Sequence, residues 1–267
     1  MPKGGSMERN YHTHTPRCNH AFNTEREFVE GAIEAGMKVL GFSDHSPYIF
    51  DGDYYSTFRM RPEMVEDYVT SILRLKEEYK RDIEIHVGLE MEYYPKYFER
   101  LCRFLEDYPL EYALLGQHCM ENEIGAHYSG TYTEDFGLLQ MFVDQMIEAF
   151  SVGKWLYVAH PDILNYPYNR PEYRTEMRRL CVAAKERGIP LEINLLGLKT
   201  RRSYPNRPFW ETAAEVGNEV VLGVDAHKVE WLVMPEIEEE AMGWVRELGL
   251  KMAPDFELGV GRHIGLR

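Results

Sequence analysis

Histidine and carboxylate side chains that could bind a metal recur at the ends of short apolar segments. The segment Tyr11–His14 contains a His-x-His pair, and Val220–His227 ends with Asp225 and His227. Residues two apart on a β-strand point to the same face, so each pair can direct two ligands at one place. The remaining candidates are His20, His45, Glu90, His118 and His160. Imidazole and carboxylate ligands together suit zinc, iron or manganese, and a carboxylate can bridge two ions.

A single histidine at a strand end usually has an ordinary hydrogen-bonding role. Here seven of the ten histidines lie at or just after such an end, and this coincidence favours a metal site. The other three differ. His86 lies early in its segment, where a hydrogen-bonded core role is expected. His127 lies in a polar loop, with solvation expected and substrate contact as the alternative, and His263 lies in the C-terminal tail with no expected role.

The apolar segments alternate with amphipathic ones along almost the whole chain. The predicted strands are residues 11–14, 39–45, 83–90, 112–118, 155–160, 191–196 and 220–227. The predicted helices are residues 24–36, 63–80, 95–108, 134–152, 172–187, 207–216 and 235–248. Seven strand–helix units in series predict a parallel α/β sheet with helices outside it, and favour a barrel over an open sheet.

Long loops follow four of the predicted strands, the second, fourth, fifth and sixth. They are Ser46–Arg61, Glu121–Thr133, Pro161–Arg170 and Gly197–Asn206. In a parallel barrel all of these loops lie at the C-terminal ends of the strands, where barrel enzymes build their active sites. The same end carries the histidines and carboxylates described above.

Composition limits the classes of protein to which the chain can belong. Its 267 residues are expected to form a single domain over residues 7–267, after a cloning remnant or disordered lead-in at residues 1–6. The net charge of −14 disfavours binding to long nucleic acids. No apolar run approaches the roughly 20 residues of a membrane span. Four cysteines without a CxxC pair, and no secretory signal, indicate free thiols and a cytoplasmic location.

Seven short motifs occur in a fixed order between about residue 8 and residue 228. They are YHTHTPRCNH, FSDHSP, GLEMEY, GQH, HPD, EINLLGLK and GVDAH. The series resembles the PHP (polymerase and histidinol phosphatase) superfamily, and above all its bacterial histidinol-phosphate phosphatase branch. The resemblance implies a distorted seven-stranded (β/α)7 barrel with its active site at the C-terminal ends of the strands. It also implies a phosphomonoesterase of histidine biosynthesis whose small phosphorylated substrate is L-histidinol phosphate.

The resemblance further implies two or three divalent transition-metal ions, which are zinc, iron or manganese. The ligand positions carried over are His12, His14, Glu90 and Asp225 for the first ion, His118 and His160 with a shared Glu90 for the second, and His20, His45 and His227 for the third. All nine positions carry a residue type that can bind a metal.

Two further residues near the expected ligands have more than one interpretation. Asp44, beside His45, could orient a ligand, could donate a proton to the leaving group, or could fix the local loop. Cys18 lies between His14 and His20 and could act as a soft ligand, although a role outside the metal site is favoured.

A phosphate substrate needs positive charge in addition to metal ions, and loop arginines can bind phosphate in a planar fork. Arg170 matches the position of the family's phosphate-binding arginine and is the favoured residue. Arg17 is a second candidate in the first loop. Many relatives have arginine where this chain has Lys199, so Lys199, Arg201 and Arg202 all remain candidates for completing the phosphate site.

Carboxylates and aromatic rings in the loops are compatible with a cationic, imidazole-containing substrate. The residues concerned are Asp51, Asp53, Tyr54, Tyr55, Phe58, Glu121, Glu123 and Tyr128. Two alternatives remain: a phosphoesterase for another small phosphomonoester or a nucleotide, and a non-catalytic binding module stabilised by metal. Structural zinc sites usually have four protein ligands and no open position. Nine ligands shared among three ions would leave open positions, which favours catalysis.

Overall fold

The computed structural model describes residues 7–260, so the lead-in at residues 1–6 and His263 lie outside the described residues. One sheet of parallel strands contains every strand in chain order. The strands are β1 (Arg9–Asn10), β2 (Val39–Phe42), β3 (Glu84–Met91), β4 (Tyr112–Leu115), β5 (Tyr157–Val158), β6 (Leu191–Asn194), β7 (Glu219–Gly223) and β8 (Lys251–Met252).

The chain beyond β1 and the chain beyond β7 meet and close the sheet into a barrel. Thr13 pairs with Ala226 in a parallel bridge, in which His14 N donates to Ala226 O at 2.9 Å and Ala226 N donates to His12 O at 3.0 Å. The seven-stranded α/β barrel predicted from the sequence is therefore confirmed. The two-residue strand β8 was not predicted, and it pairs with the opposite, N-terminal end of β7. Both of its residues are exposed, so it lacks the apolar pattern that marks a buried strand.

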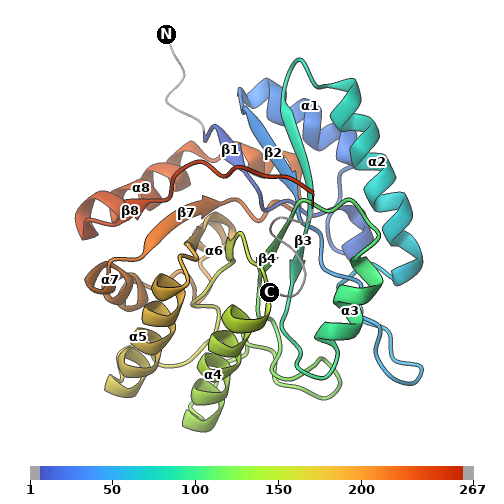
Figure 1. Cartoon of the computed structure of the whole chain (residues 1–267). Helices are drawn as coiled ribbons and strands as arrows, with labels where there is room; N and C mark the ends of the chain where they lie inside the picture. The colour runs from blue at the N-terminus through green and yellow to red at the C-terminus, as the bar shows by residue number, and fades with distance from the viewer. Residues whose placement is uncertain (1–6, 261–267) are drawn as a thin grey trace.

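Helices surround the curved sheet on its outside (Figure 1). They are α1 (Glu25–Ala35), α2 (Val65–Glu78), α3 (Phe98–Leu105), α4 (Phe136–Val152), α5 (Pro171–Glu186), α7 (Arg207–Val216) and α8 (Pro235–Leu248). The short helix α6 (Leu195–Thr200) lies at the C-terminal end of β6, and the 3-10 turns are η1 (Pro16–Cys18), η2 (Pro62–Met64) and η3 (Val229–Leu232). Thr24 and Glu27 form the expected capping box of α1. Within residues 7–260 none of these helices combines the length and apolarity that crossing a bilayer requires.

The prediction was wrong after the sixth strand. Residues 195 and 196 were assigned to the strand and the following residues to a loop, but β6 ends at Asn194 and α6 begins at once. The Asn194 side chain accepts a hydrogen bond from Gly197 N at 2.8 Å and so caps the helix. An apolar run continues from the strand into this buried helix, and for that reason periodicity alone did not separate the two elements.

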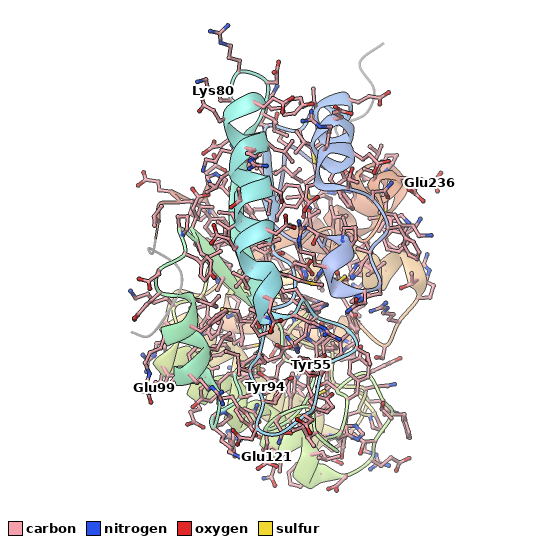
Figure 2. All side chains as sticks on the ribbon, turned by 90° about the vertical axis from the view of Figure 1, so that its right-hand side faces the viewer. Tyr55, Lys80, Tyr94, Glu99, Glu121 and Glu236 are labelled. Atoms are coloured by element: carbon pink, nitrogen blue, oxygen red, sulfur yellow. The ribbon has the colours of Figure 1, made fainter. Side chains whose placement is uncertain are left out.

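The loops that follow the strands gather at one end of the molecule, as predicted. Figure 2 shows Tyr55 and Glu121, from the loops after β2 and β4, at the end opposite Lys80, which follows α2. Below these loops an apolar cluster that includes Tyr112 and Leu114 fills the barrel. Gly88 leaves room for this filling, because a Cβ added there would lie 2.6 Å from the Tyr112 ring. The barrel is thus packed solid beneath its mouth and can support a rigid site.

Candidate metal centre

A cavity of about 440 Å³ opens at the C-terminal ends of the strands. Its lining residues are His20, His45, Phe58, Glu90, His118, Tyr128, His160, Leu196, Arg202, Tyr204, Asp225, His227 and Trp231. Seven of the nine predicted ligands are among them. The other two, His12 and His14, are fully buried beside them. The structure therefore brings all nine predicted ligands together at the mouth of the barrel.

Glu90, near the end of β3, lies at the middle of the cluster. Its Oε1 is 2.8 Å from His160 Nε2 and 3.5 Å from His118 Nε2. Its Oε2 is 3.1 Å from His45 Nδ1 and 3.5 Å from His12 Nε2. The two oxygens thus face different groups of histidines, which is the arrangement that a carboxylate bridging two ions requires.

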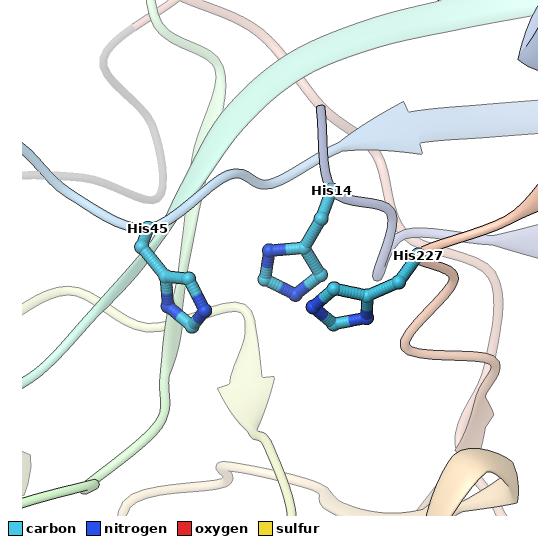
Figure 3. Close-up of side chains that lie close together, drawn as sticks. All are labelled: His14, His45 and His227. Carbon is cyan, nitrogen blue, oxygen red and sulfur yellow. The ribbon is translucent and has the colours of Figure 1, made fainter. Parts of the chain in front are cut away.

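A second part of the cluster consists of closely packed imidazoles (Figure 3). The ring centroid of His14 lies 4.1 Å from that of His227 and 4.4 Å from that of His45. Ligand atoms of these three residues lie within 4.8 Å of one another. Burial and the neighbouring His14 hold the pKa of His45 and of His227 well below the ordinary histidine value. Both rings are therefore neutral at pH 7, the form in which histidine binds metal.

Buried atoms without a hydrogen-bond partner test whether the cluster suits metal ions. Among residues 7–260, half of such atoms belong to the predicted ligands: His12 Nε2, His14 Nε2, His45 Nδ1, Glu90 Oε1 and Oε2, His160 Nδ1 and His227 Nε2. Buried polar atoms in proteins are nearly always satisfied, so a concentration of unsatisfied ones at one place needs an explanation. Their types and positions fit the binding of divalent metal ions.

The two acidic ligands carry the negative charge that metal ions require. Burial by itself would raise the pKa of Glu90 and of Asp225, but the surrounding histidines hold both values well below the ordinary range. His14 Nε2 lies 3.2 Å from Asp225 Oδ1 and contributes to this effect. Both carboxylates are therefore ionised at neutral pH, as ligation demands.

Unusual backbone geometry and two glycines support the ligand positions. Asp225 has a φ of 55° and His160 a φ of 31°, in the left-handed region that side chains rarely adopt and that concentrates at functional sites. A Cβ added at Gly116 would lie 2.7 Å from Glu90 Cδ, so only glycine leaves room for this carboxylate. Gly223 likewise gives space to the carboxylate of Glu192.

Glu192 and Glu92, which the sequence analysis did not single out, each contact one of the predicted ligands. His12 Nδ1 donates to Glu192 Oε1, and His118 Nδ1 donates to Glu92 Oε1, each at 2.8 Å. A carboxylate on the outer nitrogen of a histidine fixes its tautomer and directs the other nitrogen to the metal. A signal was available for Glu92, which follows Glu90 by two residues and so shares its side of the chain.

Asp44 is fully buried and contacts the chain segments that contain the predicted ligands His14 and His45. It accepts hydrogen bonds from the Thr15 hydroxyl and from His45 N, and its Oδ1 lies 3.4 Å from His14 Nδ1. It does not line the cavity. This placement favours the orienting and loop-fixing roles over proton donation to a leaving group, which stays a prediction.

The basic residues predicted to bind phosphate differ in whether they line the cavity. Arg202 lines the cavity and donates to the Tyr204 hydroxyl at 2.5 Å. Arg170, the favoured residue, is not among the lining residues, and its guanidinium is paired with Glu134. Its role in phosphate binding stays a prediction.

The other three basic candidates also lie away from the lining residues of the cavity. Arg17 pairs with Glu25 and Asp67, Arg201 pairs with Glu240, and Lys199 is exposed on α6. Among these candidates Arg202 is thus the one whose side chain lines the cavity beside the predicted metal ligands.

The aromatic and acidic loop residues predicted to contact the substrate also differ in whether they line the cavity. Phe58 and Tyr128 line the cavity, whereas Tyr54, Tyr55 and the four loop carboxylates are not among the lining residues. Glu123 is buried against Arg59, and Asp51 pairs with Lys96. The walls also contain Leu196, Tyr204 and Trp231, which the sequence analysis missed because no motif distinguishes a wall residue from core packing.

Two histidines outside the cluster behave as predicted. His86 is buried, with Nδ1 at 3.1 Å from Glu111 Oε1 and Nε2 at 2.9 Å from Glu84 Oε1. Its hydrogen-bonded core role is confirmed. His127 is partly exposed and its Nε2 lies 3.1 Å from Thr131 O.

Comparisons with known proteins identify similar sequences and a similar fold. The chain is 30% identical over 81% of its length to a Deinococcus radiodurans protein named "Probable histidinol-phosphatase", covering 85% of it. It is 25% identical over 83% of its length to the Bacillus subtilis histidinol-phosphatase, covering 94% of that protein. The fold matches the crystal structure of a Lactococcus lactis histidinol phosphate phosphatase, complexed with zinc, L-histidinol and phosphate. That match has a TM-score of 0.71 at 20% identity, over 96% of this chain and 98% of the other.

A family model described as the PHP domain matches residues 10–195. This range contains seven of the nine clustered ligands, all except Asp225 and His227, together with Glu92 and Glu192. The family resemblance, the barrel and the clustered ligands therefore lead to one conclusion: this chain belongs to the PHP family.

Proposed function

We propose that this chain is a metal-dependent phosphatase that hydrolyses L-histidinol phosphate to L-histidinol and phosphate. The observation that carries the proposal is an open cavity above nine clustered ligand residues, of which seven buried side-chain atoms lack a hydrogen-bond partner. The activity named for the Deinococcus and Bacillus relatives supports it, as does the ligand set named for the Lactococcus structure.

The proposed cofactors are two or three zinc, iron or manganese ions held by the nine ligands. Such ions supply positive charge to phosphate oxygens and lower the pKa of water to about 7, so that hydroxide is available at neutral pH. Glu90 would be the bridging ligand, since its two oxygens face separate groups of histidines. Asp225, His12 and His14 share one side of it.

The remaining lining residues suit the other parts of the substrate. Arg202 is the proposed basic contact to the phosphate, because a guanidinium can donate two hydrogen bonds to neighbouring oxygens. Phe58, Tyr128 and Trp231 offer flat surfaces for the imidazole ring. The strongly acidic chain, with a net charge of −14, suits a substrate that carries a cationic amine better than a polyanion.

Phosphate release with metal-loaded protein tests the proposal. Histidinol phosphate is compared with an aryl phosphate, a sugar phosphate and a nucleotide, and the metal content of the same sample is measured. We expect a preference for histidinol phosphate of at least a hundredfold in kcat/KM, which corresponds to about 2.7 kcal/mol of transition-state binding. Equal rates for all esters would support a general phosphomonoesterase, and no turnover of any ester would support a metal-binding module.

A further inference from the structure

Arg59 is a buried arginine close to the metal centre, and it has no part in the hydrolysis proposed for the cavity. It lies at the end of the loop after β2, and its side chain is only 2% exposed. Its Nε donates to Glu123 Oε1 at 2.5 Å, and one terminal nitrogen donates to Ser46 O at 2.8 Å. The other terminal nitrogen donates to Glu92 Oε1 at 2.8 Å. A buried arginine with two carboxylate partners is costly to desolvate, so its presence calls for a specific role.

Glu92 joins this arginine to a metal ligand. It is fully buried, and its Oε1 accepts both from Arg59 and from His118 Nδ1, each at 2.8 Å. With Nδ1 engaged in this way, His118 presents Nε2 to Glu90 Oε1 at 3.5 Å. Removing Glu92 would take away the partner of His118 Nδ1 and leave the imidazole free to turn. Removing Arg59 would leave Glu92 buried without its cationic partner.

The same arginine organises part of the cavity wall. Its guanidinium carbon lies 4.6 Å from the centre of the Phe58 ring. That ring in turn lies edge-on to His45 and His118, at centroid distances of 5.5 and 6.0 Å. Glu123, the other carboxylate partner, comes from the loop after β4. The two mouth loops and the ligand His118 are therefore linked through one buried side chain.

We propose that Glu92 and Arg59 are positioning residues of the metal centre: Glu92 fixes His118 as an Nε2 ligand, and Arg59 ties that ligand to the loops that form the cavity mouth. The inference rests on the proposed metal-dependent function. It goes beyond that function because it names the residues on which metal binding by Glu90, His118 and His160 depends.

The test measures zinc binding without substrate, by competition with a chromophoric chelator, in Glu92→Gln and in a matched control. Glu111→Gln is the control, since Glu111 is likewise a buried carboxylate that accepts from a histidine, His86, and from a cation, Lys76, away from the metal centre. We expect one zinc ion to bind 10- to 100-fold more weakly in Glu92→Gln and with wild-type affinity in Glu111→Gln. The visible spectrum of bound cobalt should change in the first variant alone.

Unchanged zinc affinity in Glu92→Gln, or an equal loss in both variants, would overturn the inference. If Glu92→Gln does not fold, Glu92→Asp replaces it, and wild-type affinity in that folded variant would likewise overturn it. Arg59→Met tests the link to the loops. If Arg59 acts through Glu92, the double variant should bind zinc no more weakly than Glu92→Gln alone, and additive losses would refute that link. Because substrate is absent, failure to hydrolyse histidinol phosphate would not affect these measurements.

Discussion

Replacing Gly116 by alanine tests the central position of Glu90 most directly. The added Cβ would lie 2.7 Å from Glu90 Cδ and 2.9 Å from its Cγ, and would overlap Oε1. Ordinary van der Waals contacts of a Cβ atom begin near 3.4 Å, so we expect the Glu90 carboxylate to move by roughly 1 Å. The backbone has little freedom to yield, because Gly116 N donates to Met91 O at 3.0 Å.

A displacement of this size at the reacting centre typically costs about a hundredfold in rate. We therefore expect Gly116→Ala to lower kcat/KM for histidinol phosphate by about a hundredfold, equivalent to about 2.7 kcal/mol, and to lower the zinc content. The control is Gly243→Ala in α8, where an added Cβ meets nothing within 4 Å. That variant should keep full activity and gain about 0.5–1 kcal/mol of stability. A folded Gly116→Ala protein with unchanged zinc content and kcat/KM would refute the bridging role of Glu90.

Three further predictions concern other parts of the molecule. Arg202→Ala should lower kcat/KM by about 10- to 150-fold, because a charged hydrogen bond contributes about 1.5–3 kcal/mol. A larger loss in Arg170→Ala would instead identify Arg170, the arginine expected from the family resemblance, as the phosphate contact. The pKa of Glu111 is about 2, since hydrogen bonds from His86 and Lys76 outweigh the burial that would raise it. Its contribution to stability is therefore present above about pH 4.5 and is lost as pH falls towards 2, so urea unfolding of metal-free Glu111→Gln should vary less over this range than that of wild type. Burial also raises the pKa of all four cysteine thiols, so the native protein should resist alkylation at pH 8 and react fully once unfolded.

The sequence was sufficient to predict the barrel because each buried strand is a short apolar run followed by an amphipathic segment. Capping residues such as Thr24 also marked the helix ends. The errors lie where local pattern is weak. The strand β8 has two exposed residues, and α6 continues an apolar run without a break, so neither has the periodicity on which such predictions depend.

The ligand positions could be predicted because parallel strands bring their carboxyl ends to one place. A histidine or carboxylate at each such end, as at His45 and Asp225, must then point towards its counterparts whatever the details of packing. The phosphate contact could not be predicted in this way. Arg170 and Arg202 lie in long loops, and only the folded structure shows that one lines the cavity while the other pairs with Glu134.

The residues that hold the ligands escaped prediction for a different reason. In the sequence Glu192 is an ordinary carboxylate at the second position of β6, Glu92 is one that directly follows β3, and Arg59 is one of many loop arginines. Their roles arise from contacts between distant segments: Glu192 is 180 residues from His12, and Arg59 is 33 residues from Glu92. Glycine supplies one clue, since Gly223 leaves space for the Glu192 carboxylate and Gly116 for that of Glu90. In this barrel a glycine on the strand next to a buried carboxylate therefore indicates that the carboxylate has a fixed position, and a fixed position is what a metal centre requires of its ligands and of the residues that orient them.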